Sequence, residues 1–273
     1  MSDADPFLVA ASLSGVADAD WASAAAPHVD AAVMGGIAVD SDGRAAARDL
    51  VARGRSEFLP DDPIAWIDRQ LRAVGDDVRT PGVNVRSATA GPVREAAAVC
   101  ADRGAVCEVN AHCRQPEVRA AGCGESLLCA PDRLVRLVAA ASDAGATTSV
   151  KVRTEVPGVD LAAVAERVAA AGADWLHVDA MDSEPVVADL ATALGEAEAG
   201  EETPTLVANN GVRGAATVAE YARHGADAVS AGRPTDDPAA LRRIAAAVDA
   251  WRAGESPGVC EGDPADARGE AEP

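Results

Sequence analysis

The 273-residue sequence predicts a single (β/α)8 TIM barrel, and three observations lead to this fold class. Eight short β-like runs alternate with Ala-rich stretches, which is the pattern of a parallel sheet wrapped by helices. Aromatic residues make up only 3% of the chain, so the core must consist of Ala, Val and Leu, as suits closely packed helices and parallel strands. No G-x-G-x-x-G motif follows the first strand, which disfavours a dinucleotide-binding domain. An open doubly wound sheet is the alternative fold.

The eight predicted strands follow one another at intervals long enough to hold a helix. In chain order they are Phe7 to Ala11, His28 to Met34, Val83 to Val85, Val106 to Asn110, Ser149 to Arg153, Trp175 to Asp179, Leu206 to Asn209 and Ala228 to Ser230.

Four predicted helices end at a glycine that a strand follows at once, which is the expected connection from helix to strand. They span Arg94 to Arg103, Asp132 to Asp143, Asp160 to Ala171 and Ala215 to His224. The long connection from Gly35 to Thr80 is expected to hold two more, Arg44 to Ala52 and Ile64 to Val74, and the last runs from Pro238 to about Ala253. Residues 1–253 are therefore predicted to form the barrel with its terminal helix. Residues 254–273 are rich in Gly, Pro, Glu and Asp, which predicts a disordered acidic tail.

The net charge of −20 indicates the habitat more than the partner. Acidic residues are spread along the whole chain, and Lys151 is the only lysine among 24 basic residues, a pattern typical of proteins adapted to high salt. An acidic field disfavours polyanions unless a basic patch overrides it. At a salt concentration near 1 M the screening length falls to about 3 Å, so nucleic acid is not excluded as a partner. No apolar run approaches the roughly 20 residues that span a bilayer, and the acidic start is unlike a signal peptide, so we expect a cytoplasmic protein.

The six cysteines form no C-x-x-C pair, and their spacing fits neither a zinc site nor an iron–sulfur cluster. No metal site is therefore predicted. Four of them are expected to be small buried hydrophobic residues: Cys100, Cys107, Cys129 and Cys260. Cys123, within A-G-C-G-E-S, stays open between this role and a functional one.

All four asparagines of the sequence fall in or just after predicted strands. They are Asn84, Asn110, Asn209 and Asn210. Active sites of (β/α)8 barrels lie at the carboxyl ends of the strands. Asparagine is a poor strand former, but its amide both donates and accepts, which suits heterocycle edges and phosphates. We therefore interpret them as ligand contacts, although Asn209 and Asn210 could also be ordinary turn residues before Gly211.

Lys151 lies in the predicted strand S-V-K-V-R. A lysine inside a barrel requires an anionic partner, because an unpaired buried charge is costly. The alternative is a lysine at an exposed strand end.

Two further segments place polar groups at the predicted mouth. The chain leaves the fourth strand through E-V-N-A-H-C-R-Q, Glu108 to Gln115, which carries a thiol at Cys113. Glycine turns follow the last two strands, at Asn209 to Gly211 and at Ala231 to Arg233. Backbone amides of such turns bind phosphate in many barrels, and an arginine adds charge-assisted bonds.

These motifs resemble those of the FMN-dependent dihydrouridine synthases, and more loosely those of dihydroorotate dehydrogenase-type flavin barrels. The resemblance runs from about Phe7 to Arg233 and is poor between Gly35 and Thr80. Its segments are S-G-V-A-D at Ser14 to Asp18, N-A-H-C at Asn110 to Cys113, A-G-C-G-E-S-L-L at Ala121 to Leu128, V-K-V-R at Val150 to Arg153, and the two glycine turns. The sequence departs from the family at His112 and Arg114, where the family has Gly and Pro, and at Asp179, where it has His.

The resemblance implies FMN at the barrel mouth and reduction of the C5–C6 bond of a uracil-type pyrimidine, free or in tRNA, with NADPH or NADH as electron donor. It implies Cys113 as the catalytic proton donor. The implied FMN-binding residues are Ser12, Leu13, Asn84, Asn110, Lys151, Asp179, Asn209, Asn210, Gly211, Gly232 and Arg233. The implied substrate contacts are His112, Arg114, Gln115, Arg153 and His177. His112 or His177 is the alternative proton donor.

Three other functions fit the same residues. One is a dihydroorotate or dihydropyrimidine dehydrogenase-like enzyme on a free pyrimidine. Another is a non-redox phosphate-binding barrel, such as an aldolase or isomerase that uses Lys151 as its amine. The last is a binding protein without catalysis, since a fold does not fix a function.

Overall fold

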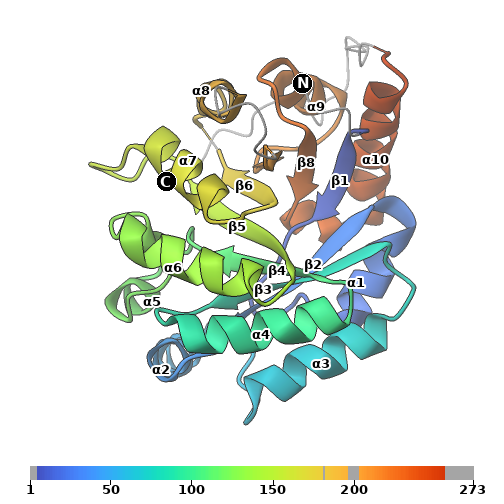
Figure 1. Ribbon diagram of the computed structural model, residues 1–273. Coiled ribbons are helices and arrows are strands. Elements are labelled where there is room, and N and C mark those ends of the chain that lie inside the picture. The colour runs from blue at the N-terminus through green and yellow to red at the C-terminus, as the bar shows by residue number, and fades with distance from the viewer. Residues whose placement is uncertain (1–4, 181, 196–202, 256–273) are drawn as a thin grey trace.

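The computed structural model describes residues 5–180, 182–195 and 203–255 as a closed barrel of eight parallel strands. The strands follow in chain order, and the last pairs with the first, which confirms the predicted (β/α)8 barrel and excludes the open sheet (Figure 1). They are β1 (Phe7–Ala10), β2 (Ala31–Ala38), β3 (Thr80–Arg86), β4 (Val106–Asn110), β5 (Thr147–Arg153), β6 (Trp175–Asp179), β7 (Thr205–Asn209) and β8 (Ala228–Ala231).

The helices lie around the outside of the barrel (Figure 1). They are α1 (Ala19–Ala25), α2 (Ser41–Ala52), α3 (Pro63–Val74), α4 (Ala90–Asp102), α5 (Pro116–Ala120), α6 (Pro131–Ser142), α7 (Leu161–Ala170), α8 (Val186–Gly195), α9 (Ala215–Arg223) and α10 (Pro238–Arg252). Aspartates cap several amino termini. Asp40, for example, accepts from the Gly43 amide at 2.8 Å and from the Ala88 amide at 2.8 Å, which ties the start of α2 to the loop after β3.

The predicted second strand was wrong at both ends. Ala26–His28 form a 3-10 helix, in which Pro27 lacks the amide that a ladder needs. At the other end β2 continues through Gly35 and Gly36 to Ala38, with an irregular register at this point. A Cβ at Gly36 would come within 3.0 Å of the Ser14 hydroxyl and 3.2 Å of the Asn84 amide oxygen. The glycine therefore serves close approach inside a strand, and does not end it.

Three helices were not predicted: α1, α5 and α8. The prediction also started α4 one turn late, at Arg94, whereas the helix includes Gly91 and Pro92 in its first turn, where Pro is tolerated. The other helices lie within three residues of their predicted bounds.

Apolar side chains form two separate cores, besides a small cluster of Leu50, Val118 and Cys123. The larger lies between the strands and the surrounding helices. The smaller fills the amino-terminal part of the barrel, where Val9, Ala31, Val33, Val207 and Ala228 pack with Phe7 and Trp175. The smaller core closes the barrel from below, so the polar residues further along the strands can gather at the carboxyl ends.

None of the described helices has the length and apolar character to cross a bilayer. Of the predicted acidic tail, residues 256–273 lie outside the described part of the chain.

Candidate functional site

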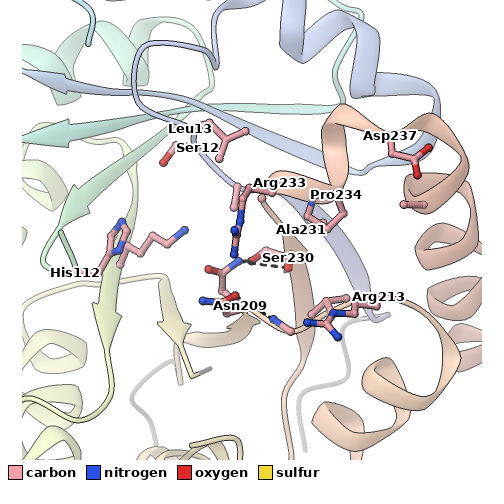
Figure 2. A pocket seen from close by; sticks show the side chains of 17 residues that line it. Ser12, Leu13, His112, Asn209, Arg213, Ser230, Ala231, Arg233, Pro234 and Asp237 are labelled. Carbon is pink, nitrogen blue, oxygen red and sulfur yellow. Dashed lines mark hydrogen bonds between the residues drawn. The ribbon is translucent and has the colours of Figure 1, made fainter. Parts of the chain in front are cut away.

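A cavity of about 570 Å³ opens at the carboxyl ends of the strands. It brings together nine residues that the sequence singled out: Ser12, Leu13, His112, Lys151, Asn209, Asn210, Gly211, Gly232 and Arg233 (Figure 2). Its volume falls in the range of roughly 300–1,000 Å³ that is common for small-molecule sites. The other candidates lie beneath the cavity or beside it.

The turn after β7 is held rigidly. Asn210 and Gly211 both have left-handed backbones, with φ of 81° and 69°, so the chain reverses sharply at the end of the strand. The hydroxyl of Tyr221, the only tyrosine of the sequence, donates to the Asn210 carbonyl oxygen at 2.8 Å and to that of Asn209 at 3.3 Å. The side chain of Asn210 donates to Asp179 at 2.9 Å, which ties the tips of β6 and β7 together. This turn is therefore preorganised.

The same end of the cavity offers donors to an anion. Among the hydrogen bonds of the described residues, none engages the backbone amides of Val212, Gly232 or Arg233. The exposed side chains of Arg213 and Arg233 line the cavity here (Figure 2). The one carboxylate of the lining, Asp237, accepts from the Ala239 amide at 2.9 Å as the cap of α10. Amides together with guanidinium groups suit a phosphate.

Lys151, on β5, also lines the cavity, and it lies close enough to His112 for its charge to lower the pKa of that imidazole. It is only 2% exposed, yet within the described residues no carboxylate oxygen lies within 4.0 Å of its amine. Burial lowers the pKa of Lys151, while Glu108 and Asp179 act in the opposite direction from a distance. The sequence predicted an anionic partner, and within the protein these two more distant carboxylates take that place. The amine thus remains available to a ligand.

A buried carboxylate, Glu108 of β4, forms the centre of the barrel interior beneath the cavity. It is fully buried, and its two oxygens accept from the Asn84 amide at 2.7 Å, the Ser149 hydroxyl at 3.0 Å and the His177 Nδ1 at 2.6 Å. Burial alone would raise the pKa of Glu108. The charges and hydrogen bonds of His177, together with Lys151 and Asn84, outweigh burial and lower this pKa to about 2. Glu108 is therefore an ionised acceptor at neutral pH.

His177 connects this carboxylate to the cavity. Its Nε2 lies 2.7 Å from the Ser230 hydroxyl, which also accepts from the Asn209 side-chain amide at 2.7 Å. His177 is buried, and burial together with Lys151 lowers its pKa despite Glu108. The ring is thus neutral at pH 7, with its proton on Nδ1 facing Glu108. The imidazole itself does not line the cavity, whereas Ser230 and Asn209 do.

Asn84 and Asn110 extend the network toward the loop after β4. Asn110 donates to the Asn84 side-chain oxygen at 2.8 Å, and its own oxygen accepts from the Cys113 amide at 3.1 Å. Both asparagines are buried, so they position the loop from below.

His112 is the part of this loop that reaches the cavity. Its Nδ1 lies 3.8 Å from an oxygen of Asp179, and both side chains are a quarter exposed. Burial and the charge of Lys151 lower the pKa of His112, and Asp179 only partly compensates. His112 is therefore neutral at physiological pH and able to accept or share a hydrogen bond.

Cys113, the predicted proton donor, does not line the cavity. It is half-buried against the small apolar cluster of Leu50, Val118 and Cys123, and its carbonyl oxygen accepts from the Glu125 amide at 3.0 Å. Cys123, which the sequence left open, is buried, and burial raises the pKa of its thiol to about 12. Cys100 and Cys107 are buried as predicted, whereas the prediction for Cys129 was wrong because it is exposed at the end of a short turn. Cys260 lies outside the described residues.

The remaining predicted substrate contacts, Arg114, Gln115 and Arg153, do not line the cavity. Arg114 is exposed, and Gln115 accepts from Arg53 at 2.9 Å. Arg153 pairs with Glu125 at 3.1 Å, and its buried Nε has no partner among the described residues.

The sequence did not reveal two residues that line the cavity, Arg213 and Ser230, or two that form the buried network beneath it, Glu108 and Ser149. Strand periodicity could have found three of them. Side chains two apart on a strand share a face, and Glu108, Ser149 and Ser230 each stand two residues before a residue that was singled out: Asn110, Lys151 and Gly232. Arg213 follows the predicted phosphate turn by two residues.

Comparisons with known proteins show the fold. No protein-family profile matches the chain. A curated relative, the uncharacterized protein MJ0144 of Methanocaldococcus jannaschii, is 29% identical over 126 residues, which is 45% of this chain and 49% of that protein. The match thus spans about half the length of the curated relative.

Solved structures with a similar fold belong to several kinds of protein. A mutant of FabK from Thermotoga maritima matches with a TM-score of 0.52 and 13% identity over 84% of this chain and 61% of its own. Orotidine 5′-phosphate decarboxylase from Pyrococcus horikoshii matches with a TM-score of 0.54 and 12% identity, over 90% of this chain and 99% of its own. A 2,3-dimethylmalate lyase of the PEP mutase/isocitrate lyase superfamily matches with a TM-score of 0.55 and 17% identity, over 94% of this chain and 84% of its own. At these identities the likeness concerns the barrel alone, a fold that these enzymes share.

Proposed function

We propose that this chain is an FMN-dependent oxidoreductase that acts on the C5–C6 bond of a uracil-type pyrimidine, with NADPH or NADH as electron donor. One observation carries the proposal. A single cavity offers a turn suited to phosphate with two arginines at one end, and at another part of its wall a buried lysine on β5 that has no carboxylate within 4.0 Å among the described residues. The resemblance to dihydrouridine synthases, whose matching segments include Lys151 and both glycine turns, supports this choice among flavin barrels.

The residues present fit FMN. The free amides of Val212, Gly232 and Arg233, with the side chains of Arg213 and Arg233, would hold its phosphate. Lys151 would lie against the flavin ring, where its ammonium favours negative charge. Bound FMN would supply hydride transfer.

The chain itself must exclude water, orient the pyrimidine and move one proton. Cys113 would serve as the acid for C5, because its thiol group is a proton donor. Its amide is anchored to Asn110 at 3.1 Å, which fixes the start of the loop that carries the thiol. His112, neutral and close to Lys151, is placed to orient a ring amide.

The first experiment is an absorbance spectrum of the purified full chain, followed by titration with FMN. We expect bound flavin with its visible absorption bands, and binding that depends on Arg233. A colourless protein that shows no FMN binding would contradict the cofactor assignment. Mass analysis of dihydrouridine in tRNA from a deletion strain would then separate a tRNA substrate from a free pyrimidine.

Replacing Arg233 by alanine is expected to raise the dissociation constant for FMN about 10- to 150-fold, because a charge-assisted hydrogen bond contributes about 1.5–3 kcal/mol. Isothermal titration would measure it. Arg242→Ala is the matched control, since Arg242 is exposed on α10 and does not line the cavity. An unchanged FMN affinity in Arg233→Ala would place the phosphate elsewhere.

Lys151→Met is expected to slow flavin reduction more than it weakens FMN binding. The ammonium stabilises the anionic reduced flavin, so its loss acts on the reduced state most. Stopped-flow reduction by NADPH or NADH, compared with the FMN dissociation constant, gives the two effects separately. Equal losses in both, or in neither, would indicate a structural lysine.

One observation favours a second candidate. The buried amine of Lys151, with its lowered pKa and no carboxylate within 4.0 Å in the described chain, also has the properties of a Schiff-base lysine. The cavity would then bind a carbonyl compound that carries a phosphate. Incubation with such compounds and borohydride, followed by mass spectrometry, would reveal an adduct on Lys151 for this candidate alone.

A further inference from the structure

The side chain of Ser230 lies on the floor of the cavity. It lies on β8 two residues before Gly232, and pairs in register with Asn209 of β7 (Figure 2). It is 1% exposed, yet its side chain lines the cavity. Because Ser230 lines the same cavity as both glycine turns, a ligand whose phosphate sits at these turns would meet this hydroxyl with the part of the molecule next to its phosphate.

The hydrogen-bond network fixes the direction in which Ser230 can bond. Glu108 accepts three hydrogen bonds, so the proton between it and His177 belongs to Nδ1 of the ring, at 2.6 Å. A neutral imidazole with its proton on Nδ1 can only accept at Nε2. The Ser230 hydroxyl, 2.7 Å away, consequently donates its single proton to Nε2.

The oxygen of Ser230 then has two lone pairs, of which one is used. The side-chain amide of Asn209 donates to it at 2.7 Å, and such an amide nitrogen has no acceptor function. One acceptor position is left, and Ser230 can offer no donor to the cavity. The group of the ligand that lies over Ser230 must therefore be a hydrogen-bond donor.

We propose that Ser230 is a specificity-determining residue that accepts a hydrogen bond from a hydroxyl group on the linker between the phosphate and the ring of the bound ligand. This inference rests on the proposed function, since in FMN the linker is a polyol chain. It deepens that proposal, because the site then selects a polyol phosphate and disfavours an alkyl phosphate of equal length.

The test compares two flavins on the full-length protein. One is FMN, and the other is a flavin whose ring carries an unhydroxylated phosphopentyl chain. The wild-type chain should bind FMN about 3- to 10-fold more tightly, as expected for a neutral hydrogen bond. Ser230→Ala should lose this preference, because it binds FMN more weakly and the phosphopentyl flavin equally well.

Ser149→Ala is the matched control. Ser149 is also a fully buried serine of the network, and its hydroxyl donates to Glu108 at 3.0 Å, but it does not line the cavity. It should retain the preference for FMN. Ser230→Thr, which keeps the hydroxyl, should also retain the preference for FMN. If Ser230→Thr lost this preference too, the loss would come from local repacking and not from the missing hydroxyl.

The possible outcomes distinguish a wrong assignment of Ser230 from a wrong assignment of the cofactor. Tight FMN binding with an unaltered preference in Ser230→Ala would overturn the assignment of Ser230 alone. Equal loss of preference in Ser230→Ala and Ser149→Ala would show a structural effect and overturn it as well. Failure of the wild-type chain to bind either flavin would overturn the proposed cofactor, and this assignment with it.

Discussion

Glu108→Leu is expected to lower the free energy of unfolding by at least about 3 kcal/mol, since it leaves three buried donors without an acceptor at about 1–3 kcal/mol each. The donors are those of Asn84, Ser149 and His177. The Glu108→Leu substitution also removes one of the two carboxylates that compensate the charge of Lys151. For a chain of this size the melting temperature should fall by roughly 2–4 °C for each kcal/mol.

Thermal unfolding followed by circular dichroism measures this effect. Glu166→Leu is the control, because Glu166 is exposed on α7 and a surface substitution of this kind changes stability by less than about 0.5 kcal/mol. A Glu108→Leu protein as stable as this control would mean that the three donors find other partners.

The same carboxylate makes stability depend on pH in a defined window. The pKa of Glu108 lies at about 2 in the folded protein, below its ordinary value of 4.5. The stability that its ionised form contributes is therefore complete above about pH 4.5 and is lost as the pH falls toward 2. Glu108→Gln has no such group, so the difference in melting temperature between it and the wild type should shrink across this window.

Cys113→Ala is expected to lower turnover by at least about a hundredfold while FMN binding and flavin reduction stay intact, because general acid catalysis contributes roughly 10²- to 10⁴-fold. Binding should be unaffected because Cys113 does not line the cavity. Stopped-flow measurements of the reductive and oxidative half-reactions separate the two steps. Only the step that passes electrons to the pyrimidine should slow.

Cys123→Ala is the matched control, since Cys123 belongs to the same apolar cluster and its thiol is buried. It should turn over normally. If Cys113→Ala also turns over normally and His112→Ala or His177→Ala does not, the proton donor is a histidine. The position of His112 on the cavity wall makes it the first histidine to test.

The strands were predictable because burial on both faces leaves a strong signal. Val106–Asn110 and Trp175–Asp179 have the predicted bounds, since both are short runs rich in β-branched or aromatic residues. The helices α1 and α8 were missed for a physical reason. The first is only seven residues long, and the second is apolar with little amphipathic pattern. Both owe their place to packing against the barrel more than to local preference.

The residues of the cavity were predictable where they are of a type that is rare in this sequence. They were not predictable where common residue types from different strands come into contact. Lys151 and the asparagines are rare in this chain, so their positions were informative. Glu108, His177 and Ser230 come from three different strands, and no spacing in the sequence shows that they touch. Their positions, one or two residues before the strand ends, were the one signal that could have joined them.

The division of the barrel interior into an apolar lower part and a polar upper part has a consequence for redesign. Removing one partner of a buried polar network leaves the others unsatisfied, whereas replacing all partners together by apolar residues of similar volume is often neutral or stabilising. Simultaneous apolar replacement of Asn84, Glu108, Ser149 and His177 would continue the packing of Val9, Val33 and Val207 upward. These four replacements alone leave Asn110 and Ser230 without a partner and Lys151 without one of its two compensating carboxylates, so these three residues must be replaced as well. The resulting barrel should then be at least as stable as the natural one, and unable to hold a ligand in a defined orientation. The polar residues of the natural interior thus provide ligand selectivity at a cost in stability. This cost can be measured as the difference in free energy of unfolding between the two barrels.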